Sequence, residues 1–124
     1  MSTDLRSVLA KLAKRIEPDL ILDSSELVSG HWVIEPPELV NNTGQWSNEA
    51  DAPLRDAQGQ LRYKLFDDQG TEYYVDINWC VPYFGENGFS ISCAWDEVNV
   101  GYTGGDGGNA TVNYYIEYAN RPAS

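Results

Sequence analysis

The sequence predicts an all-β domain built as a sandwich or barrel. Three observations carry this prediction. Apolar and polar side chains alternate with a period of two along much of the chain, turn formers including 11 glycines separate the alternating runs, and helix formers are sparse after residue 16. With 124 residues and 42% hydrophobic content, the chain has the size of one domain with one core.

The N-terminal segment has a different pattern, which predicts a short amphipathic helix over residues 1–17. Apolar residues recur at intervals of three and four, at Leu5, Val8, Leu9, Leu12, Ala13 and Ile16. Pro18 prevents continuation of the helix, so residues 18–124 are expected to form the sandwich. The polar face would carry Arg6, Lys11, Lys14 and Arg15. This face either contacts a membrane surface or stays in solvent while the apolar face packs on the sheet.

The expected strands follow from the alternation and the turn signals. In chain order they lie at residues 19–22, 26–34, near 45–47, and at 60–66, 71–79, 89–95, 99–103 and 110–118. Asp67–Gly70 supplies a hairpin turn that ends in a permissive glycine. The glycine-rich residues 104–108 are expected to be a mobile loop, because no helix follows them to bind a phosphate.

The strongest single signal lies between residues 71 and 95. The turn at residues 81–88 interrupts two alternating strands and places aromatic rings beside Pro and Gly, where turns are usually polar. Such rings at the rim of a sheet indicate a surface that binds a flat or apolar ligand. The residues that we expect to form this surface are Trp79, Pro82, Tyr83, Phe84 and Trp95.

The charge distribution limits the partners. The formal net charge is −11, which argues against nucleic acid and against unaided adsorption to anionic lipid. Residues 1–15 nevertheless carry a net +3, and the other 109 residues a net −14. No apolar run reaches the length of a transmembrane helix, and no secretory signal is visible. We therefore expect a protein made in the cytoplasm and released, if at all, by a non-classical route.

Catalytic and metal-binding patterns are missing from the sequence. His31 is the single histidine, it lies within a predicted strand, and no G-x-S-x-G motif accompanies it. Cys80 and Cys93 fall on opposite faces of neighbouring strands, so they are expected to be free thiols. No Cys/His cluster resembles a zinc site. The prediction is a protein that is not an enzyme and that needs no metal or other cofactor.

An ordered set of landmarks resembles the aegerolysin-fold proteins over residues 20–118. The landmarks are Gly30-His31-Trp32, Pro36-Pro37, Gln45-Trp46-Ser47, the run 59–63, Ile77-Asn78-Trp79, Pro82-Tyr83-x-Gly85-x-Asn87 and Gly104-Gly105-x-Gly107. The chain is most similar to the small component of two-part bacterial insecticidal crystal toxins. The turn at Val81-Pro82-Tyr83 is also similar to the corresponding turn of actinoporins.

The resemblance implies a β-sandwich that binds membrane lipids, often sphingolipids, and that works with a larger protein partner to form pores. In actinoporins the aromatic turn helps to hold the lipid headgroup, and this role transfers to Pro82 and Tyr83. Trp79, Phe84 and Trp95 are added from their positions alone. The N-terminal helix departs from the insecticidal component and is similar to the helix that actinoporins insert. The acidic body departs from actinoporins, which are commonly basic.

Two other functions are compatible with the residues. Aromatic faces with Asn, Asp and Gln side chains also suit a carbohydrate-binding module. The acidic body also suits a protein-interaction or immunity-type protein that engages a basic partner. Homo-oligomerisation is compatible with all three functions: lipid binding, carbohydrate binding and protein interaction.

Overall fold

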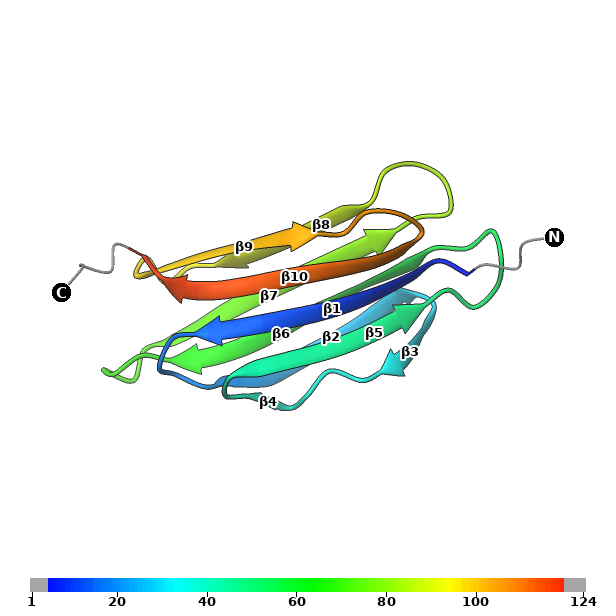
Figure 1. Cartoon of the computed structure of the whole chain (residues 1–124). Coiled ribbons are helices and arrows are strands. Elements are labelled where there is room, and N and C mark those ends of the chain that lie inside the picture. Colours follow the sequence, from blue (N-terminus) through cyan, green and yellow to red (C-terminus); the bar gives the residue numbers. More distant parts are fainter. Residues whose placement is uncertain (1–4, 120–124) are drawn as a thin grey trace.

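The computed structural model describes residues 5–119 and folds them into two stacked five-stranded sheets (Figure 1). Sheet A contains, in spatial order, β3 (His31–Ile34), β5 (Thr43–Glu49), β1 (Ser7–Arg15), β10 (Asn109–Tyr118) and β9 (Val98–Gly104). Sheet B contains β4 (Leu39–Val40), β2 (Leu20–Ser29), β6 (Ala57–Phe66), β7 (Glu72–Val81) and β8 (Gly88–Cys93). The predicted all-β sandwich is confirmed.

The predicted N-terminal helix is wrong. Residues 7–15 form β1, the middle strand of sheet A, and residues 1–4 lie outside the described part of the chain. β1 pairs antiparallel with β5 on one side and parallel with β10 on the other. Within residues 5–119 the structure has no helix that is long and apolar enough to cross a membrane.

The spacing of apolar residues in β1 explains the error. Val8, Leu12 and Ile16 are four residues apart, which is close to one helical turn and equals two repeats of a strand. Ala10 and Lys14 also point inward, with exposed fractions of 0% and 8%. The Lys14 ammonium donates to the main-chain oxygens of Ile16 and Glu17. These hydrogen bonds offset part of the cost of burying the charged group. Pairing with two neighbouring strands then favours the strand over the helix.

Aromatic side chains fill the space between the sheets. The largest buried side chains include Trp46, Tyr63, Trp79 and Tyr114. The Tyr63 hydroxyl donates to the Pro37 oxygen and the Tyr114 hydroxyl to the Asn78 oxygen, each at 2.7 Å. Burial raises the pKa of both hydroxyls, so they stay protonated donors at neutral pH.

The turn between β6 and β7 and the crossing from β2 to β3 each depend on a specific residue. Asp67 Oδ1 accepts from the amides of Gln69 and Thr71 at 2.9 and 2.8 Å, which closes the predicted hairpin turn between β6 and β7. Gly30 adopts a φ of 98° where the chain passes from β2 in sheet B to β3 in sheet A. A Cβ at this glycine would lie 2.4 Å from the Glu49 oxygen, so the crossing requires glycine.

The two cysteines are free, as predicted. Cys80 lies opposite Gly88 and Cys93 opposite Val75, so the register of β7 and β8 keeps the thiols apart. Burial raises the pKa of both thiols, which lowers the thiolate fraction at neutral pH.

Candidate functional site

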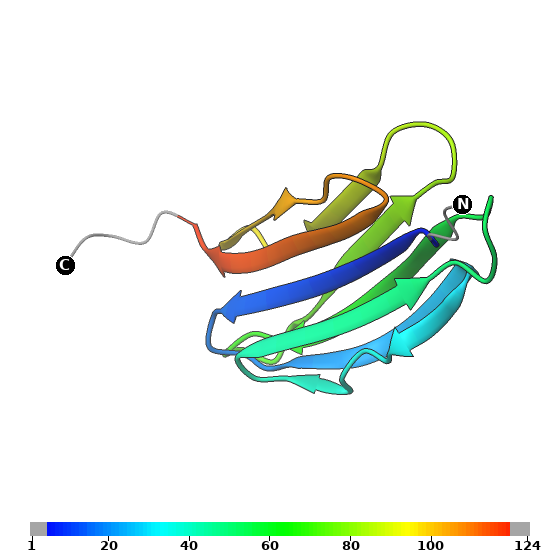
Figure 2. The ribbon, with the colours of Figure 1, turned by 45° about the vertical axis from the view of Figure 1, so that its right-hand side comes forward.

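The turn at residues 82–87, between β7 and β8, projects from one end of the sandwich (Figure 1, upper right). Among residues 5–119, Phe84 is the most exposed of the large hydrophobic side chains, at 89%, and Tyr83 is 45% exposed. The structure therefore opens these two rings to solvent at the rim, where the sequence predicts them. Loop 105–108, between β9 and β10, lies at the same end of the molecule (Figure 2).

Arg6 and Asp56 hold the first half of this turn. The Arg6 guanidinium donates from Nε to the Pro82 oxygen and from Nη2 to the Tyr83 oxygen, both at 3.3 Å. Its central carbon lies 5.6 Å from the centre of the Tyr83 ring, within the range of a cation–π contact. The Tyr83 amide donates to Asp56 Oδ1 at 2.8 Å. The turn is thus anchored through its main chain while Phe84 stays free.

Asn87 ties the second half of the turn to loop 105–108. Its side-chain nitrogen, Nδ2, donates to the main-chain oxygens of Gly105 and Gly107 at 2.8 and 2.9 Å. Gly105 has a φ of 95°, and a Cβ there would lie 2.4 Å from the Phe89 ring. Glycine is therefore required at position 105 for the close approach of this loop to Phe89 in β8.

A hollow of about 520 Å³ opens between the turn and the loop. One guanidinium, from Arg6, and two carboxylates, from Glu86 and Asp106, line it. The rings of Tyr83, Phe89 and Tyr102 line it as well. We call Arg6, turn 82–87 and loop 105–108, with this hollow, the rim site. The charges in the hollow suit a small zwitterionic group. The exposed ring of Phe84, on the same turn, can enter an apolar phase such as a bilayer.

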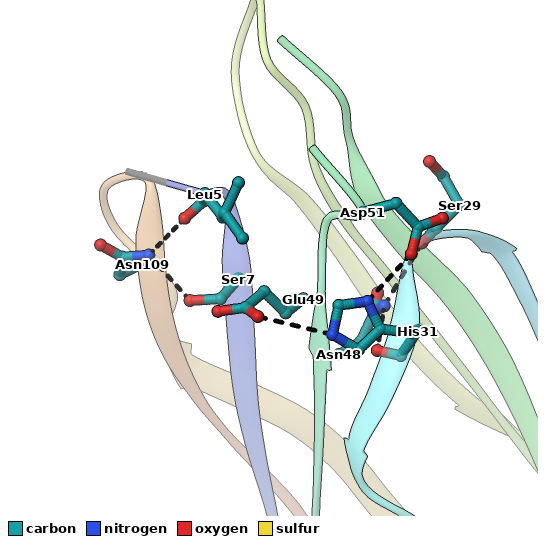
Figure 3. Close-up of polar contacts among 8 residues, drawn as sticks. All are labelled: Leu5, Ser7, Ser29, His31, Asn48, Glu49, Asp51 and Asn109. Atoms are coloured by element: carbon teal, nitrogen blue, oxygen red, sulfur yellow. Dashed lines mark hydrogen bonds and ion pairs between the residues drawn. The ribbon is translucent and has the colours of Figure 1, made fainter. Parts of the chain in front are cut away.

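A second group of polar contacts lies along the end of sheet A (Figure 3). Asn109 donates to the Leu5 oxygen at 2.7 Å and to Ser7 Oγ at 2.8 Å, which fixes the start of β1 against β10. Across the sheet, His31 Nδ1 lies 2.9 Å from Asp51 Oδ1 and Nε2 lies 3.4 Å from Glu49 Oε1. In residues 5–119 no three His, Cys, Asp or Glu side chains gather as metal ligands.

Comparison with solved structures identifies the fold. The lipid-binding protein Nakanori superposes with a TM-score of 0.75 at 11% identity, over 90% of this chain and 71% of that one. RahU, solved in complex with a Tris molecule, superposes with a TM-score of 0.68 at 11% identity, over 94% and 98%. The fold is aegerolysin-like. No protein-family model and no curated protein matches the chain by sequence.

Two of the residues predicted for the aromatic surface of this aegerolysin-like sandwich lie in the core instead. Trp79 is 1% exposed and Trp95 is 5% exposed. Trp79 Nε1 donates to Asn48 Oδ1 at 3.0 Å, and the Trp95 ring stacks on Tyr73 with a centroid distance of 5.7 Å. Neither indole can therefore serve as a surface contact, whereas Pro82, Tyr83 and Phe84 belong to the rim site.

The four basic residues predicted to share a membrane-contact face do not share one. Arg6 joins the rim site, Lys14 points into the core, and Arg15 pairs with Glu117 at 3.1 Å. Lys11 is exposed on the outer face of sheet A. The predicted face is wrong because β1 alternates between two sides of a sheet, where a helix would group these residues on one.

The sequence analysis missed the residues that hold the turn and the loop in place, namely Asp56, Asn87 and the glycine carbonyls of loop 105–108. It also missed Phe89 and Tyr102, which line the hollow. One signal was present. Asn87 is part of the Pro82-Tyr83-x-Gly85-x-Asn87 landmark, and an Asn at the end of a turn is well suited to bind main-chain groups. Asp56 and Arg6 carry no local signal, because their partners are 27 to 77 residues away.

Proposed function

We propose that the protein is a non-enzymatic membrane-lipid-binding module and that the rim site is its contact with the bilayer. The observation that carries the proposal is Phe84, 89% exposed on a turn whose main chain is anchored by Arg6 and Asp56. A fixed turn presents its ring without further ordering, so less conformational entropy is lost on binding. Nakanori, which has a similar fold, is a lipid-binding protein.

The charges of the rim site favour a zwitterionic headgroup. Arg6 supplies one positive charge, while Glu86 and Asp106 supply two negative charges around the same hollow. With a formal net charge of −11, the protein is repelled by anionic bilayers. Sphingolipids with a zwitterionic headgroup are therefore our proposed ligands.

A toxin-like role belongs to the same proposal. We propose that the membrane-bound protein, once released from the cell that makes it, acts with a larger protein partner in pore formation, as the resemblance to the small component of binary insecticidal toxins implies. Dye release from sphingomyelin liposomes measures this directly. Release by this chain alone would replace the partner-dependent role with a self-sufficient pore.

Liposome pelleting of a Phe84→Ser variant tests the lipid contact. Burial of a phenylalanine side chain is worth about 1.5–3 kcal/mol, so we expect the affinity for sphingomyelin or ceramide phosphoethanolamine liposomes to fall tenfold or more. Phosphatidylcholine and phosphatidylserine liposomes test the headgroup preference and the repulsion by anionic lipid.

Phe66→Ser is the matched control for this measurement. Phe66 is also exposed, at 43%, but it ends β6 beside the 67–71 turn, at the far end of β7 from the rim site (Figure 1). We expect this variant to bind as the unmodified protein does. Equal binding by folded Phe84→Ser and the unmodified protein would refute the rim site as the membrane contact.

Carbohydrate binding is a second candidate because the chain has another hollow, in which apolar lining residues lie beside a row of polar side chains. About 620 Å³ in volume, it lies on the outer face of sheet A and is lined by Lys11, Gln45 and Asn113, which are direct neighbours across β5, β1 and β10. Amide and ammonium groups in a row can donate to sugar hydroxyls. Binding on a glycan array without binding to liposomes would favour this function over the first.

A further inference from the structure

We infer that the connection between β5 and β6 makes a second contact with the bilayer, through the side chain of Leu54. The inference rests on the proposed function, because it adds to the contact that Phe84 makes. It starts from the backbone of Leu54, which has a φ of 68°. Within residues 5–119 every other residue with a positive φ is a glycine.

The turn that contains Leu54 would be more favourable with a different residue. Pro53 and Leu54 lie in a tight turn that leads toward β6. Proline followed by a residue of positive φ is the pattern of a type II turn, in which the second of these positions normally holds glycine or asparagine. A leucine there brings its Cβ close to the main chain, which costs stability that glycine would not cost.

The Leu54 side chain does not offset this cost through burial in the protein. It is 66% exposed, second only to Phe84 among the large hydrophobic side chains of residues 5–119. A leucine stabilises a fold by removing its surface from water, and Leu54 keeps most of that surface in water. A strained backbone that holds an apolar side chain in solvent indicates a contact made outside the chain.

The turn that carries Leu54 is tied to the turn that carries Phe84. Asp56 Oδ1 accepts from the Tyr83 amide at 2.8 Å. Leu54 precedes Asp56 by two residues and Phe84 follows Tyr83 by one. Roughly 10 Å of extended chain in total therefore lies between that hydrogen bond and the two exposed side chains. Both connections emerge at the same end of the sandwich (Figures 1 and 2).

A bilayer is the partner that fits this arrangement. Single apolar side chains on neighbouring turns can enter the hydrocarbon of a bilayer without a matching surface, whereas a stable protein interface needs about 800 Å² on each partner. Arg55, which follows Leu54, is exposed as well. Its guanidinium can donate to a lipid phosphate while the leucine enters the apolar phase. Leu54 and Arg55 thus match the two layers of a bilayer, the acyl chains and the phosphates above them.

A double-mutant cycle in liposome pelleting tests the contact. Leu54→Asn keeps a side chain of similar size and is compatible with a positive φ, but it removes the apolar surface. We expect its affinity for sphingomyelin liposomes to be about tenfold lower, the effect of one leucine side chain that is no longer buried. Independent contacts add in free energy, so the same substitution should lower the affinity of Phe84→Ser about tenfold again. If the double variant binds no more weakly than Phe84→Ser, Leu54 acts only through the other turn and the inference is overturned.

Urea unfolding separates a membrane contact from a structural role. Because asparagine accepts the left-handed conformation more readily than leucine, we expect Leu54→Asn to unfold at the same or a higher urea concentration than the unmodified protein. A variant that unfolds at a lower urea concentration and binds liposomes unchanged would assign Leu54 to the fold and overturn the inference.

Leu39→Asn is the matched control. Leu39 is also an exposed leucine, at 52%, but it pairs with Ile21 near the start of β2, away from the end that carries the two turns (Figure 1). We expect this variant to bind sphingomyelin liposomes as the unmodified protein does. Equal losses in Leu39→Asn and Leu54→Asn would trace the effect to general surface hydrophobicity and remove the specific role of Leu54.

The inference and the proposed function fail in different ways. Binding that falls in Phe84→Ser but not in Leu54→Asn overturns the second contact and leaves the first one standing. An absence of liposome binding by the unmodified protein overturns the proposed function, and the second contact falls with it. Sedimentation without lipid tests the other possible occupant, a second copy of the chain. Dimers that are lost in Leu54→Asn would assign the leucine to that interface and overturn the bilayer contact.

Discussion

Asn48 is the residue that joins the core to the edge of sheet A. Its side chain is fully buried and makes three hydrogen bonds. It accepts from Trp79 Nε1 at 3.0 Å and donates to the oxygens of Ser29 and His31 at 3.3 and 3.1 Å. The connection between β2 and β3 is thereby hydrogen-bonded, through Asn48, to the buried indole of Trp79 in sheet B.

Asn48→Ala is expected to lower the free energy of unfolding by about 3 kcal/mol or more, because each buried group left without a partner costs about 1–3 kcal/mol. Urea unfolding followed by tryptophan fluorescence measures the loss. Asn78→Ala is the control, since Asn78 is exposed and its side chain contacts only Ser90 Oγ, at 3.2 Å, among its hydrogen bonds in residues 5–119. Similar losses in both variants would contradict this role for Asn48.

At the scale of residues, the sequence predicts some positions and not others. The exposure of Tyr83 and Phe84 was predictable, because aromatic rings in a Pro/Gly turn have no strand to orient them inward. The burial of Trp79 was predictable as well, since it shares the alternation of Val75 and Ile77, which are 0% exposed. The place of Arg6 was not, because its acceptors lie 76 and 77 residues further along the chain.

At the scale of elements, β1 shows where a local pattern is insufficient. Its apolar spacing fits a helix and a strand alike, and its Ala, Leu and Lys content favours a helix. The choice is made by β5 and β10, which pair with both edges of β1 and lie far from it in sequence. In contrast, β6, β7 and β8 are joined by short turns, so their pairing was readable from the local sequence.

Substitutions of Lys11 separate the strand from the helix experimentally. Lys11 is exposed in the middle of β1, where side-chain packing contributes little. In a strand, Thr is favoured over Ala by up to about 1 kcal/mol, whereas in a helix Ala is favoured by about half that or slightly more. We therefore expect Lys11→Thr to unfold at a higher urea concentration than Lys11→Ala. The opposite order would contradict the assignment of β1.

At the scale of the whole molecule, the two ends of the described chain meet in the middle of one sheet. β1 and β10 are parallel neighbours, from Ser7 beside Asn109 to Arg15 beside Glu117. A parallel pair between the first and last strands cannot be formed by any local turn, and no local pattern predicts it. The sequence thus predicts a sandwich and its hairpins, while the closure of the sandwich depends on contacts across nearly its full length.

This closure predicts that a chain of residues 18–124 does not fold alone. Its sheet A would be divided into the pair β3–β5 and the pair β10–β9. The buried side chains of Val8, Leu12 and Ile16 would be lost as well, worth about 5–9 kcal/mol, which is comparable to the total stability of a small domain. Circular dichroism and tryptophan fluorescence of this fragment should show an unfolded chain.

Addition of a peptide of residues 5–17 should restore the folded spectra, because the peptide can insert as the missing strand between β5 and β10. Leu12 is 1% exposed on the inner face of β1, so Leu12→Asp in the peptide should abolish the rescue. Leu9 lies on the outer face of the same strand, and Leu9→Asp should largely preserve it. Equal rescue by both peptides, or a fragment that folds without either, would show that β1 is an accessory to the sandwich and not its centre.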